Sequence, residues 1–199
     1  MAIPDRRAAA ELLASFNPPD WHLRHVTGVA EVAAFLAARM AARGISIDRP
    51  LVEAAALLHD VDRLLPADDP LQALGHGEAG GRWLLQHGQG ELARAVAAHS
   101  VTRLTDEDRY HRWAAGATRE ERIVAYADKR CGQQLEPMAS RFAEWGRRHP
   151  DYAPGLAVAR PRANRLEREV CDAAGVRPDE VRRLRWVAGV WPPRTEQVA

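Results

Sequence analysis

The segment from Leu51 to Leu58 constrains the fold most, because it is almost entirely apolar and is followed at once by two polar residues. Its sequence, LVEAAALL, has the composition of a buried helix. His59 and Asp60 come next, at adjacent positions. Adjacent residues on a helix point about 100° apart, and both side chains can still reach one metal ion if the helix ends there. The pair alone is weak evidence for a metal site, so other residues must supply its context.

Apolar residues recur at helical spacing along the rest of the chain, and no stretch alternates as a β-strand would. Boundary residues support this pattern, with Asp48 as a helix N-cap, Pro50 in a first turn, Gly44 as a stop signal and Thr118 opening a capping box. We expect helices over residues 5–15, 21–43, 48–64, 75–88, 91–99, 118–145 with a kink or break at Pro137, 166–174 and 178–187. We expect loops over residues 66–75, 100–117 and 149–161. The sequence therefore predicts an all-α domain with seven or eight helices.

The size and charge of the chain limit the classes of function. The 199 residues, of which 46% are apolar and 28% are charged, are enough for one compact domain, and the net charge of +1 argues against nucleic-acid binding. No apolar run is long enough to span a membrane, and the N-terminus has no signal-peptide core, so we expect a cytoplasmic protein. Cys131 and Cys171 lie far apart and are expected to be buried free thiols.

Candidate metal ligands fall on five separate helical segments. They are His25, His59, Asp60, His76, His99 and Asp128. Each lies beside apolar or small residues, where an unpaired polar group would be costly to bury, and a shared metal centre would give all of them partners. Four imidazoles and two carboxylates suit one or two divalent ions of Fe, Mn, Zn, Ni or Co, with Asp60 as a bridge and positions left open for water. The alternative for His59 and Asp60 is a polar pair at a helix end. For His76 and His99 it is a satisfied or substrate-facing histidine beside a single ion.

The order of these residues resembles that in the HD superfamily of metal-dependent phosphohydrolases. The matching segments are WHLRHVTGVA (21–30), ALLHDVDR (56–63), GHGEAG (75–80), VAAH (96–99) and IVAYADK (123–129). The resemblance implies a single domain over residues 1–199. Its core, an HD-like orthogonal helical bundle, would cover about 20–135, and extra C-terminal helices would cover about 136–195. His25, the His59-Asp60 pair and Asp128 match the minimal signature, which holds one divalent metal in relatives. His76 and His99 match the members that have a dinuclear centre.

The resemblance implies hydrolysis of a nucleotide or another small phosphate ester or anhydride by a metal-activated water, with a small phosphorylated molecule as the partner. Arg63, Arg103, Lys129 and Arg130 are candidates to hold phosphate oxygens, and Arg63 and Lys129 are favoured because each lies within three residues of a candidate ligand. Asp62 or Glu78 could orient the water or accept its proton, beside Asp60 as the bridging carboxylate. Val61-Asp62-Arg63 departs from the glycine or lysine that many relatives have after the His-Asp pair. The Gly-Tyr-Pro signature of cyclic-di-GMP enzymes is absent.

Two other functions remain open. A di-iron oxygenase on the same scaffold would use the same six ligands, and a non-catalytic module would keep the fold only to bind a ligand. A homodimer is one option for the assembly, since Trp145, Trp186 and Trp191 could form an interface or cover the site. The remaining residues singled out by the sequence are expected at the surface: the histidines His22, His87, His111 and His149, the arginines Arg177, Arg182, Arg183 and Arg185, and the acidic loop 106–108. His22 could instead line the pocket.

Overall fold

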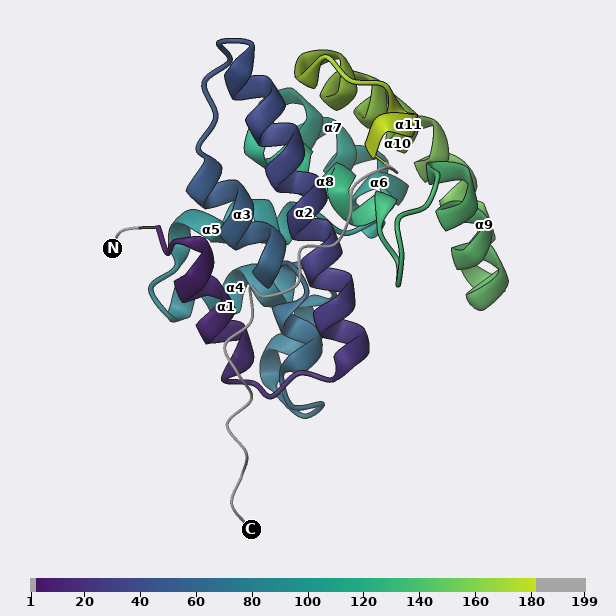
Figure 1. The fold of residues 1–199 in the computed structure, drawn as a ribbon. Coiled ribbons are helices and arrows are strands. Elements are labelled where there is room, and N and C mark those ends of the chain that lie inside the picture. The colour runs from purple at the N-terminus through teal and green to yellow at the C-terminus, as the bar shows by residue number, and fades with distance from the viewer. Residues whose placement is uncertain (1–2, 182–199) are drawn as a thin grey trace.

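The computed structural model describes residues 3–181, which fold into packed helices (Figure 1). This range contains no β-strand, although Cys131 and Leu135 form an isolated antiparallel bridge. The α-helices are α1 (Arg6–Ala14), α2 (Asp20–Ala42), α3 (Arg49–Leu58), α4 (Glu78–Gln86), α5 (Gly90–Ala98), α6 (Thr102–Thr105), α7 (Glu107–Gly116), α8 (Arg119–Arg130), α9 (Met138–Arg148), α10 (Ala153–Ala174) and α11 (Pro178–Val181). The 3₁₀ helices are η1 (Val61–Leu64), η2 (Pro70–Leu74) and η3 (Pro150–Tyr152). The predicted all-α fold is confirmed.

α2, α3 and α8 form the centre of the bundle. α2 packs against both α3 and α8, and α5 packs against the same two helices. The facing sides carry fully buried apolar side chains, such as Leu36 of α2, Leu57 of α3 and Ile123 of α8. Burial of each such side chain stabilises the fold by about 1.5–3 kcal/mol. These contacts fix the ends and inner faces of the helices, where the candidate ligands lie.

Several helix boundaries were predicted correctly from capping residues. Asp48 Oδ1 accepts a hydrogen bond from Leu51 N at 3.0 Å, and Thr118 Oγ1 accepts one from Glu121 N at 3.2 Å. At the other end of a helix, Gly175 follows α10 with a φ of 65°, a conformation that glycine adopts without steric cost. Short polar residues and glycines therefore mark these helix ends, as the sequence indicates.

The prediction of a loop over residues 100–117 is wrong, because α6 and α7 occupy most of this segment. Asp106 Oδ1 accepts a hydrogen bond from Arg109 N at 2.8 Å, so the acidic run starts α7 and is not a solvated loop. α7 buries only Tyr110 and Trp113, and a polar helix with two core residues gives little apolar periodicity to detect.

Four further segments differ from the predictions. α3 ends at Leu58 and η1 follows it, so one regular helix does not run from 48 to 64. The helix expected over 118–145 ends at Arg130, and α9 begins directly after Pro137, where a break was expected. Residues 149–161, expected to be a loop, form η3 and the start of α10, which continues through Pro161. The expected loop 66–75 contains η2.

The predictions for Arg182, Arg183, Arg185, Trp186 and Trp191 lie outside the described residues.

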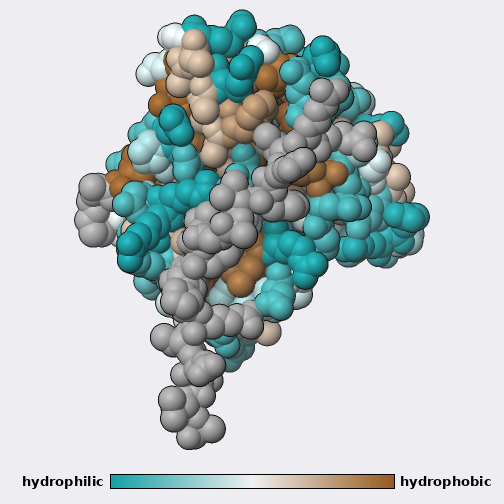
Figure 2. Space-filling model, viewed as in Figure 1, coloured by the Kyte–Doolittle hydropathy of each residue, from teal (hydrophilic) through white to brown (hydrophobic). Residues whose placement is uncertain are grey.

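The surface is that of an ordinary globular protein over the described range. The face drawn in Figure 2 is mainly hydrophilic, with apolar side chains in smaller separate areas. None of the described helices combines the length and the apolar character needed to cross a membrane. Cys131 and Cys171 are buried free thiols, as predicted.

Candidate metal centre

The structure brings all six candidate ligands together in the middle of the bundle. His25 lies on α2, His59 and Asp60 directly follow α3, and Asp128 lies on α8. The other two are His76, in the turn before α4, and His99, directly after α5. All except His76 are buried, and the His76 side chain is 28% exposed. Segments far apart in the sequence therefore supply one cluster.

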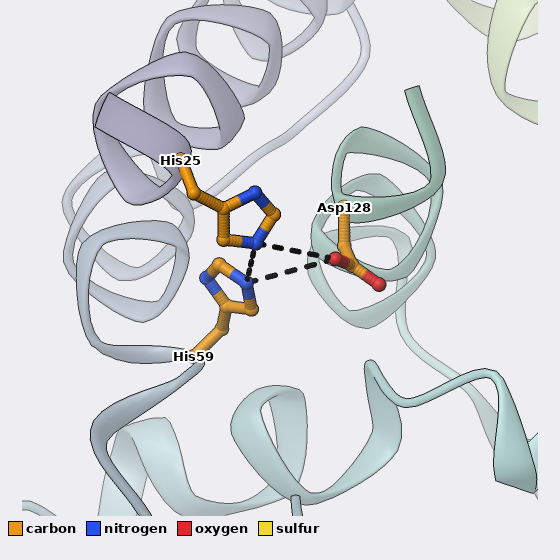
Figure 3. A group of neighbouring side chains, drawn as sticks. All are labelled: His25, His59 and Asp128. Atoms are coloured by element: carbon orange, nitrogen blue, oxygen red, sulfur yellow. Dashed lines mark hydrogen bonds and ion pairs between the residues drawn. The ribbon is translucent and has the colours of Figure 1, made fainter. Parts of the chain in front are cut away.

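One half of the cluster consists of His25, His59 and Asp128, which point toward one another (Figure 3). The Nε2 atoms of His25 and His59 are 3.0 Å apart. Asp128 Oδ1 lies 3.6 Å from His25 Nε2 and 3.7 Å from His59 Nε2. Two imidazole nitrogens and a carboxylate oxygen thus face a common point.

The other half consists of His76, His99 and Asp60. The Nε2 atoms of His76 and His99 are 3.1 Å apart, and Asp60 Oδ1 lies 3.3 Å and 3.4 Å from them. Asp60 also reaches the first half, with Oδ2 3.6 Å from His25 Nε2 and Oδ1 3.6 Å from His59 Nε2. Asp60 therefore lies between the two halves, where a carboxylate that bridges two ions would lie.

In each of the four imidazoles, the nitrogen that faces away from the cluster makes a hydrogen bond, and these bonds set the tautomer of the ring. The Nδ1 atoms donate to Gly132 O (His25, 3.3 Å), Ala56 O (His59, 2.8 Å), Asp62 Oδ2 (His76, 2.8 Å) and Val96 O (His99, 2.6 Å). Carbonyl and carboxylate oxygens only accept, so the hydrogen of each neutral ring is on Nδ1 and the lone pair is on Nε2.

The same local hydrogen bond at a helix C-terminus orients His59 and His99. Each is the C-cap of its helix, and each ring donates back to the carbonyl three residues earlier, in the last turn of that helix. The ring is held by the last turn of the helix and its Nε2 is directed away from it. Helix ends at Leu58 and Ala98 therefore explain how two buried imidazoles are oriented alike.

Two pairs of Nε2 lone pairs at 3.0 and 3.1 Å repel each other unless a cation lies between them. The cation is either a proton or a metal ion. Imidazole nitrogens that share a divalent ion would have to lie close together, as both pairs do. The donor set of four imidazoles and two carboxylates, with Asp60 Oδ1 buried and lacking a hydrogen-bond partner among the described residues, fits a divalent transition metal.

The electrostatics of the cluster favour the deprotonated forms of Asp60, Asp128 and His99, which are the forms that bind a metal. Burial opposes ionisation of Asp60, but the surrounding His59, His99, His76 and His25 lower the pKa of its carboxyl well below the usual range. The pKa of Asp128 is lowered too, since its neighbours outweigh its burial. Burial lowers the pKa of His99 to about 4. His59 differs, because Asp60 and Asp128 overcome its burial and raise its pKa.

Glycines at the start of α4 let this helix approach the cluster. A Cβ on Gly81 would lie 2.7 Å from Ala93 O of α5, and a Cβ on Gly80 would lie 3.1 Å from Asp62 Oδ1. Only glycine therefore allows α4 and α5 to pack at this distance. The close contact brings the turn that carries His76 beside His99.

Asp62 acts on the site through His76. Its Oδ2 accepts the hydrogen bond from His76 Nδ1 at 2.8 Å, and its side chain is almost fully buried. The carboxylate is therefore engaged in orienting a candidate ligand, and its predicted role as a proton acceptor for water has no support in this geometry.

Replacing Asp62 by alanine is expected to weaken metal binding roughly 10- to 100-fold, because His76 loses the acceptor that fixes its tautomer. The measurement is competition against a chromophoric chelator. Asp68→Ala is the matched control, since Asp68 is exposed in the nearby loop. Equal metal affinity in the two variants would show that Asp62 does not support the site.

The predicted phosphate-binding residues are placed very differently from one another. Arg63 Nε lies 3.1 Å from Asp60 Oδ2, and the Arg63 side chain is about half exposed beside the cluster. Lys129 is fully buried, and its Nζ donates to His99 O at 2.6 Å and to Ala125 O at 3.0 Å. The predicted contact of Lys129 with phosphate has no support in these contacts, because its side chain ties α8 to the end of α5 and its Nζ lies 3.7 Å from Asp128 Oδ2.

Arg130, Arg103 and Glu78 are also engaged away from the cluster. Arg130 is buried and donates to Glu136 O and Pro178 O, which ties α8 to the later part of the chain. Arg103 pairs with Glu78, which also accepts from Arg109 at 2.8 Å. The predicted roles of Arg130 and Arg103 in phosphate binding, and of Glu78 in proton transfer, have no support in these contacts.

A cavity of about 100 Å³ opens at the cluster. His25, Asp60, His76, Asp128 and Arg63 line it together with four residues that the sequence did not indicate as ligands or phosphate contacts, namely Ser100, Val101, Arg141 and Trp145. Trp145 was only one of several tryptophans that could cover the site. No sequence signal identifies Arg141, because it comes from a helix beyond the matching segments.

His22 is buried, so its expected surface position is wrong. Neither ring nitrogen has a hydrogen-bond partner within the described part of the chain, and burial lowers its pKa to about 4. Its spacing of three residues from His25 on α2 was the signal that could have indicated burial.

The comparisons with known proteins agree with this geometry. The model of the HD domain family matches residues 23–131, more than half of the chain, and this segment carries all six candidate ligands. No curated protein and no solved structure matched the chain.

Proposed function

The chain belongs to the HD domain family, and from this premise we propose that it is a metal-dependent phosphohydrolase acting on a nucleotide or another small phosphate ester or anhydride. The observation that carries the proposal is the pair of facing Nε2 contacts, with Asp60 between them, at a cavity that also carries Arg63. This arrangement offers sites for one or two divalent ions beside a cation that can bind phosphate.

The residues that would hold the metal divide into two sets. His25, His59 and Asp128 would form one and His76 and His99 the other, with Asp60 close to all four histidines. Asp60 also groups with His59 and His99. When bound, the metal supplies a water of lowered pKa and positive charge that offsets the charge developing on phosphate oxygens.

The chain's own residues bind and orient the substrate. Arg63 is three residues after Asp60, and its guanidinium is held beside Asp60 Oδ2 while about half of the side chain stays exposed. It can therefore turn its remaining donors toward a phosphate oxygen without losing its contact with Asp60. His59 and His99, both fully buried, close the inner wall of the site and exclude water from that side.

The test is to purify the protein, reconstitute it with each of Fe, Mn, Zn, Ni and Co, and measure phosphate release from a panel of nucleotides and small phosphate esters. We expect metal-dependent phosphate release without oxygen consumption. Bound iron with oxygen uptake and no phosphate release would favour an oxygenase instead. Tight nucleotide binding without turnover by any metal form would favour a non-catalytic module.

A further inference from the structure

The helix α9 lies outside the segment that matches the HD domain family, yet it contributes to the cavity of the metal centre. α9 is anchored by Met138 and Phe142, which are buried in the core. The link that leads to it is held at the site itself, because Gly132 O accepts the hydrogen bond from His25 Nδ1. The side chains that α9 presents to the cavity are therefore fixed relative to the metal centre.

Arg141 is the charged residue that α9 presents to the cavity. Its side chain is 8% exposed, its guanidinium lies 4.7 Å from the centre of the Trp145 ring, and Nη1 donates to Glu144 Oε2 at 2.6 Å. Arg141 Nε is buried without a hydrogen-bond partner among the described residues. An arginine has five N–H donors, and within residues 3–181 the side chain of Arg141 makes one hydrogen bond, so most of its donors have no partner there.

The charge of Arg141 is only partly balanced by its own helix. Glu144 is shared with Arg148, whose Nη2 lies 2.6 Å from Glu144 Oε1. With Asp60 and Asp128 engaged as ligands, Arg63 and Arg141 leave the cavity wall positive, which favours an anion with more than one charge.

The cavity volume limits what can be enclosed. About 100 Å³ is well below the roughly 300–1,000 Å³ of pockets that enclose whole small-molecule ligands. A phosphoryl group fits this space and a nucleoside does not. The rest of the substrate must therefore lie outside the cavity.

We propose that Arg141 binds the non-reacting oxygens of a terminal phosphoryl group, so that α9 is a wall of the substrate site and selects phosphate monoesters and terminal phosphates over diesters. This inference rests on the proposed function and deepens it by naming the substrate class. Trp145 and Glu144 act as positioning residues, because they hold the guanidinium while its other donors stay free.

The experiment compares the full-length wild type with Arg141→Gln, Arg141→Lys and the control Arg147→Gln, which changes an exposed arginine of the same helix. Binding of inorganic phosphate to the metal-loaded proteins is measured by calorimetry, with metal content and thermal unfolding determined on the same samples. We expect Arg141→Gln to raise the Kd for phosphate roughly 10- to 100-fold with unchanged metal content, the loss expected when one or two charge-assisted hydrogen bonds are removed. Arg141→Lys should show a smaller loss, because it keeps the charge but not the planar fork.

A purely structural role of Arg141 would change thermal unfolding and leave phosphate affinity close to that of Arg147→Gln, and this result would overturn the proposal. Failure of the metal-loaded wild type to bind phosphate would overturn it as well. If Arg141→Gln does not fold, an unchanged phosphate affinity in Arg141→Lys is the contradicting result.

Turnover of p-nitrophenyl phosphate and of its bis-ester separates this inference from the proposed function. Wild type should prefer the monoester, and Arg141→Gln should lose that preference through a higher KM. The protein could bind phosphate in a way that depends on Arg141 and yet turn over neither ester and no substrate of the panel. This result would contradict the proposed function but support the anion site at Arg141. Equal use of both esters by the wild type would contradict the selectivity assigned to α9.

Discussion

Replacing Asp60 by alanine is expected to remove the bound metal and to lower phosphoester hydrolysis by at least about 10³-fold, because a metal contributes several kcal/mol of transition-state stabilisation. Asp60 is the residue whose carboxylate lies within 3.6 Å of all four imidazole Nε2 atoms. Its loss therefore affects both halves of the site at once. Metal content by elemental analysis and initial rates with the best substrate measure the two effects.

The control for this variant is Asp68→Ala, which removes an exposed carboxylate a few residues away. It should keep the metal content and rate of the wild type. The interpretation of Asp60 as the shared ligand is refuted if Asp60→Ala retains both at the wild-type level.

Replacing His99 by alanine is expected to remove one ion of two and to lower activity roughly 100-fold, while the other ion stays bound. His99 is fully buried and pairs with His76, whereas His25, His59 and Asp128 form a group of donors that does not include His99. A dinuclear site uses both ions to stabilise the attacking and leaving oxygens, so one ion alone leaves part of the catalysis. Metal-to-protein stoichiometry is the decisive measurement.

His111→Ala is the matched control, because His111 is exposed and its ring contacts Glu107 away from the cluster. Two ions per chain in the His99→Ala protein would show that His99 is not a ligand. Equal stoichiometry of one in wild type and variant would mean that the site holds a single ion, bound by the His25 side of the cluster.

Much of the fold was predictable because helices carry local signals. Apolar spacing and capping residues such as Asp48 and Thr118 report on structure within a few residues of themselves. The polar helix α7 has little apolar spacing, so it was not predicted. Proline often ends helices, but α10 continues through Pro161, so the boundary predicted there was wrong.

The candidate ligands were indicated by the sequence, but the direction of neighbouring side chains depends on local geometry. Lys129 is adjacent to Asp128 on α8, and adjacent helical residues point about 100° apart, so its Nζ faces backbone carbonyls instead of the cavity. Arg63 follows Asp60 by three residues in a 3₁₀ turn, where residues i and i+3 lie one above the other, and its Nε comes within 3.1 Å of Asp60. Closeness in sequence to a candidate ligand was the basis for predicting both Lys129 and Arg63 as phosphate contacts. Only the local secondary structure shows that Arg63 lies at the cavity and Lys129 does not.

Arg141 could not be predicted, because its place at the cavity results from long-range packing. α9 begins ten residues after Asp128, and the intervening link is held to α2 through His25. Its spacing of three residues from Met138 and four from Trp145 was a signal for burial of Arg141, but no sequence signal places that face of α9 at the cavity.

Elemental analysis of the purified protein, before and after reconstitution with Fe, Mn, Zn, Ni and Co in turn, tests the convergence of the four histidines and two aspartates on a metal most directly. We expect one or two equivalents of a divalent transition metal per chain in the wild type and none in Asp60→Ala. A wild-type protein that takes up no more of any of these metals than Asp60→Ala would contradict the account.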